Sequence, residues 1–186
     1  MVDNRDGFQV EERGFIAVVT LNRPEKRNAM DLAMIRGLTD LADALALRPE
    51  LKAVVLTGGP EYFTAGMDVS DMALLDSPDI PLVEQRKRLG FAPAMCRAWE
   101  NMPQVTVAAM EGFCLGGGVS LASALDFRVM AQSSRIRAPE IDLGMNMSWG
   151  TLPRLLHLMG PARTKQLIIL GEDVGAREAV DWGFAQ

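Results

Sequence analysis

The sequence feature that most constrains the fold is a run of glycines between an apolar segment and a series of small residues. Val105–Met110 is apolar and partly β-branched, and Gly112–Ser120 follows it with three successive glycines, Gly116–Gly118. We expect a strand, a tight turn and the start of a helix, because glycine permits close approach of the backbone. The first N–H groups of a helix have no internal partner, so such a turn can hold a negatively charged oxygen. Alternatively, the glycines only let the helix pack closely against the strand.

The first third of the chain predicts an α/β fold with a largely parallel sheet. Phe8–Arg13 and Phe15–Leu21 flank a glycine and predict a β-hairpin. Asp31 is a suitable N-cap for a helix that ends at Arg48–Pro49, and Lys52–Gly59 is a second buried strand. A strand, a helix and a strand at this spacing favour a right-handed crossover between parallel strands.

The rest of the chain continues this alternation, and we predict a single domain that covers residues 1–186. A chain of 186 residues with 48% hydrophobic content can bury a substantial core, and no linker or repeat divides it. The expected elements are a helix over Leu82–Met102 with a break at Pro93, a short strand at Phe127–Met130, and helices around Leu152–Met159, Ala162–Leu170 and Arg177–Trp182.

Composition and charge narrow the possible partners. The 24 acidic and 19 basic residues leave a net charge of −5, which argues against duplex nucleic acid, although Arg23–Arg27 and Arg86–Arg88 can grip a small anionic ligand. The two cysteines are too few for a disulfide framework and lack metal-ligand spacing, so we expect no metal and a cytoplasmic location. We find no leader and no apolar run long enough to span a bilayer, and expect no membrane association. His157 is the one histidine, so we do not expect catalysis by imidazole.

The loops after the predicted strands carry candidate ligand-binding groups. Asn22–Met30 is rich in cations and forms either the rim of an anion site or a solvated turn. In Tyr62–Ser70, small residues allow a ligand to lie against the main chain, and Asp68 can brace the loop by accepting hydrogen bonds from its N–H groups. Pro139 fixes the backbone beside Glu140, a carboxylate that follows another strand.

Taken together, four of these stretches resemble the crotonase, or enoyl-CoA hydratase/isomerase, superfamily, and they occur in the order typical of that family. The resemblance covers nearly the whole chain and implies an α/β spiral of ββα units with C-terminal helices. It also implies a homotrimer or hexamer that acts on an acyl-CoA thioester, with coenzyme A as part of the substrate and no separate cofactor. The four stretches are Asn22–Ala29, Phe63–Asp68, Gly112–Gly118 and Pro139–Gly144.

The resemblance also assigns roles to individual residues. The N–H groups of Met67 and Gly117 would hold the thioester oxygen, which becomes negative when a proton is removed beside the thioester. Glu140 would carry that proton as a general acid and base. Lys26 and Arg27 would lie near the phosphates of coenzyme A. The residues that would line or flank the bound substrate are Ala29, Ala65, Gly66, Asp68, Val69, Ser70, Gly116, Gly118 and Pro139.

Ser120 departs from the hydratase pattern, in which a second glutamate stands at this position. A single carboxylate suffices for a double-bond shift, because one base can take a proton from one carbon and return it to another. Serine here also resembles the hydratase-lyases that act on hydroxycinnamoyl-CoA esters, where Ser120 would orient a water or a substrate hydroxyl. Met72 stands where those lyases carry a phenol-recognising tyrosine. The third alternative is a non-catalytic acyl-CoA-binding subunit.

Two further departures concern the region after Glu140 and the end of the chain. Met145, Met147 and Trp149 are bulky and apolar where many family members carry a proline and several glycines. These side chains either reshape the acyl pocket or pack in the core. Family members also continue beyond the equivalent of Asp181–Ala185 into a helical segment that helps close the site and the trimer. We therefore expect that this C-terminal segment is missing from the sequence.

Overall fold

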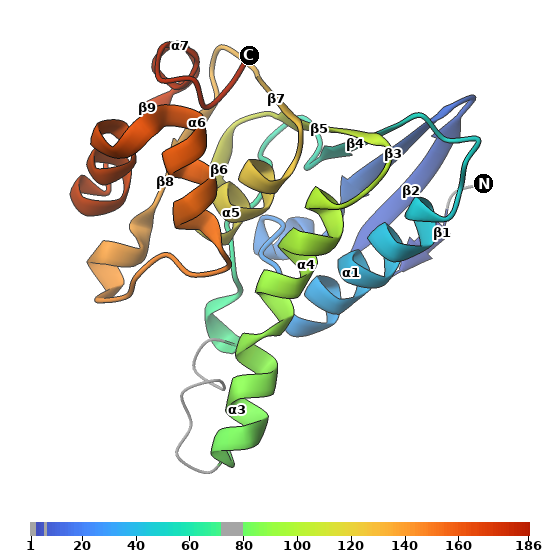
Figure 1. Ribbon diagram of the computed structural model, residues 1–186, viewed down its shortest axis with the longest axis horizontal. Coiled ribbons are helices and arrows are strands. Elements are labelled where there is room, and N and C mark those ends of the chain that lie inside the picture. Colours follow the sequence, from blue (N-terminus) through green and yellow to red (C-terminus); the bar gives the residue numbers. More distant parts are fainter. Residues whose placement is uncertain (1–2, 6, 72–79) are drawn as a thin grey trace.

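The computed structural model describes residues 3–5, 7–71 and 80–186, which form two sheets and a layer of helices (Figure 1). The larger sheet has six strands in the order β1-β2-β3-β4-β5-β7. Strands β1 to β3 are antiparallel, and β3, β4, β5 and β7 run parallel to one another, as the sequence predicted for the strands that flank the first helix. The bounds are β1 Asp3–Arg5, β2 Phe8–Arg13, β3 Ile16–Leu21, β4 Ala53–Thr57, β5 Val105–Met110 and β7 Phe127–Met130.

A second, smaller sheet repeats the order of the first. It consists of β6 (Phe113–Leu115), β8 (Arg135–Arg137) and β9 (Val174–Gly175). Two parallel bridges, Met30 with Met67 and Thr64 with Cys114, extend this row toward the N-terminal part of the chain. Each of β3, β4, β5 and β7 is thus followed by a short extended segment in the second row and then by a helix. The predicted spiral of ββα units is confirmed.

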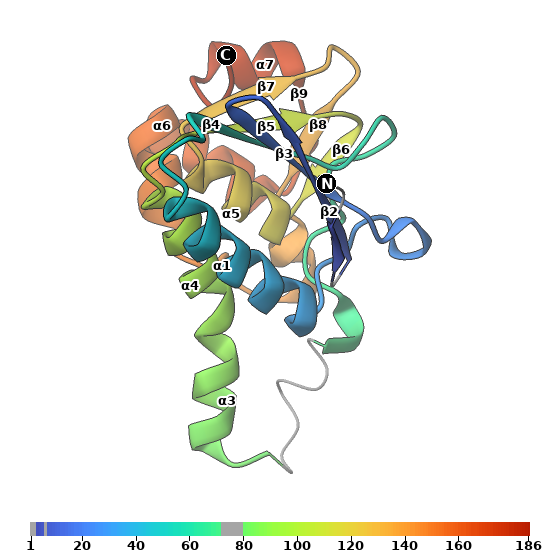
Figure 2. The same cartoon turned by 90° about the vertical axis from the view of Figure 1, so that its right-hand side faces the viewer.

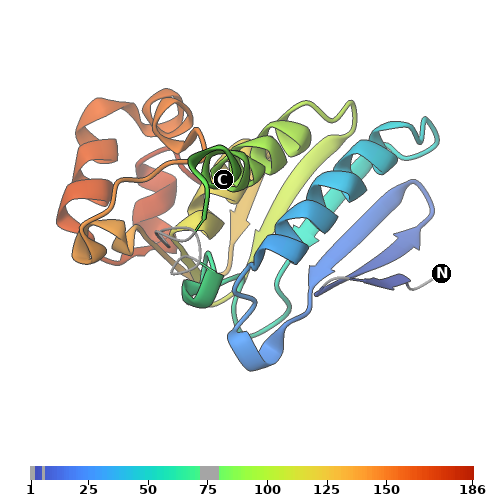
Figure 3. The same cartoon turned by 90° about the horizontal axis from the view of Figure 1, so that it is seen from below.

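The helices cover one face of the larger sheet. In Figures 2 and 3, α1 (Leu32–Ala46), α4 (Phe91–Glu100) and α5 (Gly117–Ala124) lie side by side on this face, and α4 packs against both of the others. The fully buried Trp99 fixes α4 to α1 by donating from Nε1 to the carbonyl of Leu38 at 3.1 Å. Asp31 caps α1 as predicted, because its side chain accepts from the N–H of Met34 at 2.8 Å.

The predicted helix break at Pro93 is wrong in its position. Helix α3 (Leu82–Leu89) ends before Gly90, and Pro93 lies in the first turn of α4. Proline is tolerated there because the first N–H groups of a helix have no internal partner. Its missing N–H instead leaves the carbonyl four residues earlier, that of Leu89, without a helical donor, so the boundary falls ahead of the proline. Figure 1 shows α3 extending away from the rest of the molecule.

The C-terminal part of the chain packs beside the second sheet. Helix α6 (Thr151–Lys165) is kinked at Gly160, which has a φ of +71°, and this kink separates the two helices expected from the sequence. The remaining elements are two 3₁₀ turns, η1 (Pro24–Lys26) and η2 (Pro139–Leu143), a π-helical turn η3 (Gln166–Leu170), and α7 (Ala176–Asp181). No helix in the described ranges is long and apolar enough to cross a membrane.

A buried arginine ties the last residues to the sheet. Arg128 of β7 is only 2% exposed, and its guanidinium donates to the carbonyls of Leu125 and Phe184. The backbone of Arg128 is also bonded to Gln186, from which it receives one hydrogen bond and to which it donates another. These bonds join β7, the end of α5 and the end of the chain into one packed unit.

Candidate functional site

The glycine turn lies against the loop that follows β4. The bridge between Thr64 and Cys114, with the N–H of Leu115 donating to the carbonyl of Thr64 at 3.0 Å, aligns the two segments. Gly66 has a φ of +90°, and a Cβ at this position would lie 2.8 Å from the carbonyl oxygen of Leu115 and 3.2 Å from the nitrogen of Gly117. Only glycine fits between two backbones this close without displacing one of them.

Two backbone N–H groups are free for a ligand at this contact. Gly117 is the first residue of α5, where an N–H has no helical partner. In the bridge to Met30, the Met30 N–H donates to the carbonyl of Gly66, and the Asp68 N–H donates to the carbonyl of Met30. The N–H of Met67, which lies between these two residues, takes no part in the bridge. Within the described part of the chain, neither the Met67 nor the Gly117 N–H donates to a protein acceptor.

Both segments line a cavity of about 810 Å³. This volume lies within the range of about 300 to 1,000 Å³ that is common for small-molecule sites, and apolar side chains make up much of the wall. Its described lining consists of Leu32, Ile35, Ala65, Gly66, Met67, Val69, Gln85, Arg88, Leu89, Ala92, Gly116, Gly117, Ser120, Pro139, Glu140, Leu143, Met145, Asn146, Ser148 and Trp149.

Glu140 lies in η2, directly after β8, and faces the glycine turn that follows the neighbouring strand β6. The pairing of Leu115 with Arg137, and the hydrogen bond of 2.9 Å from the Gly116 N–H to the Arg137 carbonyl, bring η2 opposite the turn. A Cβ on Gly116, whose φ is +48°, would lie 2.7 Å from Glu140 Oε1. The other oxygen, Oε2, is buried and has no hydrogen-bond partner among the described residues. Burial raises the pKa of this carboxyl, because the charged form loses hydration.

Ser120 lies in the same wall but already has a protein partner. Its hydroxyl is 2.6 Å from that of Thr151, which is also 2.6 Å from the carbonyl of Ser148. Thr151 Oγ1 has one proton, which it can donate either to the Ser120 hydroxyl or to the Ser148 carbonyl, and Ser120 Oγ can itself donate to the Gly116 carbonyl at 3.5 Å. In either case the oxygen of Ser120 keeps a lone pair with which it can accept from a ligand, but it has no charge.

Asp68 braces its own loop, as the sequence predicted, and it also contacts the cationic loop Asn22–Met30. The side chain of Asp68 is 6% exposed, accepts from the Ser70 N–H at 3.0 Å, and lies 3.4 Å from Arg23 and 3.7 Å from Lys26. Burial raises the pKa of Asp68, but the hydrogen bonds from Ser70 and the two nearby cations outweigh burial and lower it. The charge of Asp68 is thus used within the protein, while Lys26 remains about half exposed at the surface.

The structure brings most, but not all, of the predicted residues together. The cavity wall includes Ala65, Gly66, Met67, Val69, Gly116, Gly117, Ser120, Pro139 and Glu140. The described wall does not include Lys26, Arg27, Ala29, Asp68, Ser70 or Gly118. Gly118 instead packs against Thr64, whose Cγ2 would lie 2.4 Å from a Cβ on it. The remaining sequence argument, on Met72, falls outside the described residues.

Sequence reasoning missed several wall residues. Leu32 and Ile35 lie on the apolar stripe of α1 and are typical of core packing, so their pattern gave no sign of a site. Arg88 was noted only as part of a basic cluster that can grip a small anion, and here it is paired with Glu84 at 2.9 Å. Thr151 does not line the described cavity, and its link to Ser120 gave no signal because it joins two helices that are far apart in sequence.

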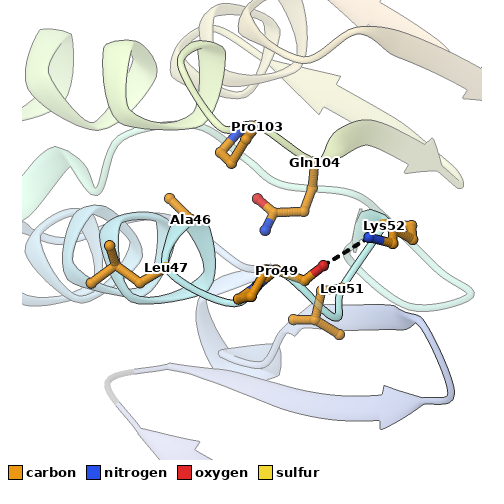
Figure 4. A pocket seen from close by; sticks show the side chains of 7 residues that line it. All are labelled: Ala46, Leu47, Pro49, Leu51, Lys52, Pro103 and Gln104. Atoms are coloured by element: carbon orange, nitrogen blue, oxygen red, sulfur yellow. Dashed lines mark hydrogen bonds between the residues drawn. The ribbon is translucent and has the colours of Figure 1, made fainter.

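A second cavity, of about 500 Å³, lies before the N-terminal ends of β4 and β5 (Figure 4). There Lys52 donates to the carbonyl of Pro49 at 2.8 Å, and Gln104 donates to the carbonyls of Leu45 and Arg48 at 2.8 and 3.1 Å. None of its described lining residues is an acid, a histidine or a cysteine. Across the described ranges, no group of three or more His, Cys, Asp or Glu side chains can hold a metal ion.

Comparison with known proteins extends this description. A family model described as enoyl-CoA hydratase/isomerase matches residues 11–186. The short-chain-enoyl-CoA hydratase of Clostridium acetobutylicum is 33% identical over 176 residues, which are 94% of this chain and 66% of that protein. The mitochondrial Delta(3,5)-Delta(2,4)-dienoyl-CoA isomerase of Rattus norvegicus is 35% identical over 173 residues, or 89% of this chain and 53% of that protein. The chain thus spans less than two thirds of the length of these relatives.

Solved structures show the same fold. The crystal structure of an enoyl-CoA hydratase/carnithine racemase from Magnetospirillum magneticum superposes with a TM-score of 0.90 at 29% identity, covering 98% of this chain and 67% of that one. The sheet order, the paired short segments and the family match agree with one another over nearly all of the sequence. The chain therefore belongs to the enoyl-CoA hydratase/isomerase family of the crotonase superfamily.

Proposed function

We propose that the protein shifts a carbon–carbon double bond in an acyl-CoA thioester, with Glu140 as its single acid and base. The observation that carries this proposal is the common cavity of Glu140 and the free N–H groups of Met67 and Gly117. Glu140 is the one carboxylate among the described lining residues. Hydration by the two-carboxylate route would need a second such group, and Ser120 stands in the wall without one.

The proposed reaction begins with a 3-enoyl thioester whose carbonyl oxygen lies between the two N–H groups. The Glu140 carboxylate removes a proton from C2, and the electrons of that C–H bond move onto the thioester oxygen through the new C1–C2 double bond. Each N–H stabilises the resulting oxyanion, and the loss of such a donor costs about 3 to 4 kcal/mol in other enzymes. The protonated Glu140 then delivers the proton to C4, which gives the conjugated 2-enoyl thioester and restores the carboxylate.

The environment of Glu140 suits this role. Burial raises the pKa of Glu140, so its ionised form is a stronger base than an exposed carboxylate. Its protonated form is correspondingly a weaker acid. Because the ionised form starts the reaction, turnover should rise with pH as Glu140 loses its proton. Oε2 has no hydrogen-bond donor within the described chain, so no such donor stabilises the ionised carboxylate at this oxygen or lowers its basicity.

The remaining assignments follow the family pattern. Lys26 and Arg27 are proposed to lie near the phosphates of coenzyme A, with Ala29, Asp68 and Ser70 along its path. Support comes from the partial exposure of the Lys26 side chain, 47%, beside a loop whose backbone is fixed by Asp68. A trimeric or hexameric assembly, a cytoplasmic location, and coenzyme A as part of the substrate with no separate cofactor belong to the same proposal.

The test follows the absorbance of the conjugated thioester with 2-enoyl, 3-enoyl and hydroxycinnamoyl CoA esters. We expect conversion of the 3-enoyl ester to the 2-enoyl ester, and no loss of conjugation from the 2-enoyl ester through addition of water. Water addition without isomerisation would refute the proposed reaction in favour of hydration. Cleavage of the hydroxycinnamoyl ester would point to a hydratase-lyase.

The variant Glu140→Gln tests the proton carrier. It should abolish turnover while CoA-ester binding persists, because the amide cannot accept and return the proton. Glu111→Gln is a matched control, since Glu111 is exposed and lies outside the cavity wall. Unaltered turnover in Glu140→Gln would sink the assignment, and tight binding without turnover in the unmodified chain would identify a non-catalytic acyl-CoA binder.

A further inference from the structure

The turn before α6 holds a bulky aromatic residue in a backbone conformation that such residues rarely adopt. Trp149 has a φ of +57° and is followed by Gly150 at +74°. Glycine enters this left-handed region freely, but a bulky side chain there is an outlier. Strained residues persist only where the surrounding structure fixes them, and they are concentrated at ligand-binding and active sites.

Arg154 fixes this turn from further along α6. Its Nη1 donates to the carbonyl of Trp149 at 3.1 Å and to that of Gly150 at 3.2 Å. The guanidinium is itself held by Glu100 of α4, with Nε 2.9 Å from Oε1 and Nη2 2.6 Å from Oε2. Bidentate pairs of this kind are geometrically specific. The backbone of Trp149 is therefore fastened to α4 as well as to α6.

The indole ring lies against the glycine that would supply one of the oxyanion donors. A Cβ on Gly117 would lie 2.4 Å from Cη2 and 2.5 Å from Cζ3 of Trp149, so the edge of the six-membered ring occupies the space that a side chain at Gly117 would need. The same ring lines the cavity, and so does the preceding residue, Ser148. If the thioester oxygen binds at the Gly117 N–H, the ring borders the space beside that oxygen. An acyl chain that runs toward the ring has to stop there.

On the basis of the function proposed above, we propose that Trp149 closes the acyl end of the cavity and restricts the protein to CoA thioesters with a short acyl chain. Arg154 fixes the backbone from which the ring projects, so the Cα of Trp149 cannot shift away from the cavity without breaking these hydrogen bonds. Apolar pockets discriminate against one methylene too many by about 10- to 200-fold. Trp149 is thus a specificity-determining residue, and the proton transfer at Glu140 is unchanged by it.

The first arm of the test measures binding and does not depend on turnover. Saturated acyl-CoA esters of increasing chain length are titrated calorimetrically into the unmodified protein, Trp149→Ala and Trp149→Phe. We expect the affinity of the unmodified protein to fall at least about tenfold for each methylene beyond a short limit. Trp149→Ala should keep its affinity for chains several carbons longer, and Trp149→Phe should shift the limit by a smaller amount, because a phenyl ring fills part of the space.

The matched control is Leu156→Ala, because Leu156 is an exposed residue of α6 that does not line the cavity. It should bind the series as the unmodified protein does. An identical chain-length profile in Trp149→Ala and the unmodified protein would overturn the proposal. If Trp149→Ala does not fold by circular dichroism, the profile of Trp149→Phe decides in the same way.

The second arm repeats the series with 3-enoyl esters and separates the two proposals. A shifted binding profile without isomerisation in the unmodified protein would support the role of Trp149 and refute the reaction. Isomerisation with an unshifted profile would support the reaction and refute the role of Trp149.

Discussion

The contact between Gly66 and the glycine turn makes a sharp prediction for the substitution Gly66→Ala. A Cβ there would lie 2.8 Å from the carbonyl oxygen of Leu115, against 3.4 Å for ordinary contact, so the two backbones must separate by about 0.6 Å. The φ of +90° adds a strain of roughly 1–2 kcal/mol for an L side chain. Forcing an extra carbon into a packed region typically costs a further 1–3 kcal/mol or so.

Gly59→Ala supplies the matched control. Gly59 has almost the same φ, +87°, but a Cβ there would meet nothing within 4 Å. It should therefore lose only the strain of roughly 1–2 kcal/mol, whereas Gly66→Ala should lose about 2–5 kcal/mol. For a chain of this size, each kcal/mol lowers Tm by about 2–4 °C. Thermal unfolding followed by circular dichroism measures the difference directly.

The same pair of variants tests whether the spacing of the two N–H groups matters for catalysis. Loss of one oxyanion donor lowers kcat about 10²- to 10³-fold in other enzymes. We expect Gly66→Ala to lower kcat for a 3-enoyl-CoA ester by about 100-fold relative to Gly59→Ala, with a smaller change in KM. Equal activity and equal Tm in the two variants would refute the reasoning, because the close backbone contact would then have no consequence.

Three further substitutions test how much single side chains contribute to the free energy of unfolding. Burial raises the folded-state pKa of Glu140, so its contribution to stability is present below the ordinary carboxyl pKa and is lost as pH rises through the raised value. In urea titrations at neutral pH, Glu140→Gln should therefore be more stable than the unmodified protein, by about 1.4 kcal/mol for each unit by which the pKa is raised. This gain in stability should vanish below about pH 4, where both proteins are neutral at this position. A gain that is larger in acid would contradict this account. Arg128→Met leaves the carbonyls of Leu125 and Phe184 without their buried donor. In the same assay, the free energy of unfolding should fall by about 3 kcal/mol or more. A fall of less than about 1 kcal/mol would contradict the packing described for the chain end. Asp31→Ala removes the N-cap of α1 and should cost about 1 kcal/mol at neutral pH, measured by urea unfolding, with no loss expected if the cap were only a surface contact.

Local signals were sufficient to predict much of the fold. The hairpin of β2 and β3, the cap at Asp31 and the glycine-led start of α5 each depend on neighbours in the sequence. The break in the α3–α4 segment was misplaced because proline acts on the carbonyl four residues before it. In the second sheet, β8 is the strand expected before Glu140, whereas β6 and β9, with three and two residues, are too short for any periodicity to mark them.

The candidate site also contains some groups that local sequence signals predict and some that they do not. Glu140 and the glycine turn could be found from their residue types and from the family pattern, since each is marked by its own sequence. The link from Ser120 to Thr151 and the hold of Glu100 on Arg154 could not be found, because they depend on contacts between separate helices. The left-handed conformation of Trp149 contradicts the local preference of tryptophan, and the bonds from Arg154 to the carbonyls of Trp149 and Gly150 help to hold it.

The spiral has a consequence for the order in which the site can be assembled. Met67 follows β4, Gly117 follows β5 and Glu140 follows β7, so each of three successive turns contributes one group. A chain that is synthesised from its N-terminus therefore produces the two N–H groups before the carboxylate. Because a domain generally folds as a unit, the three groups come together only after all three turns have been synthesised. A nascent chain that lacks the last turn would have the oxyanion donors in its sequence but no acid or base.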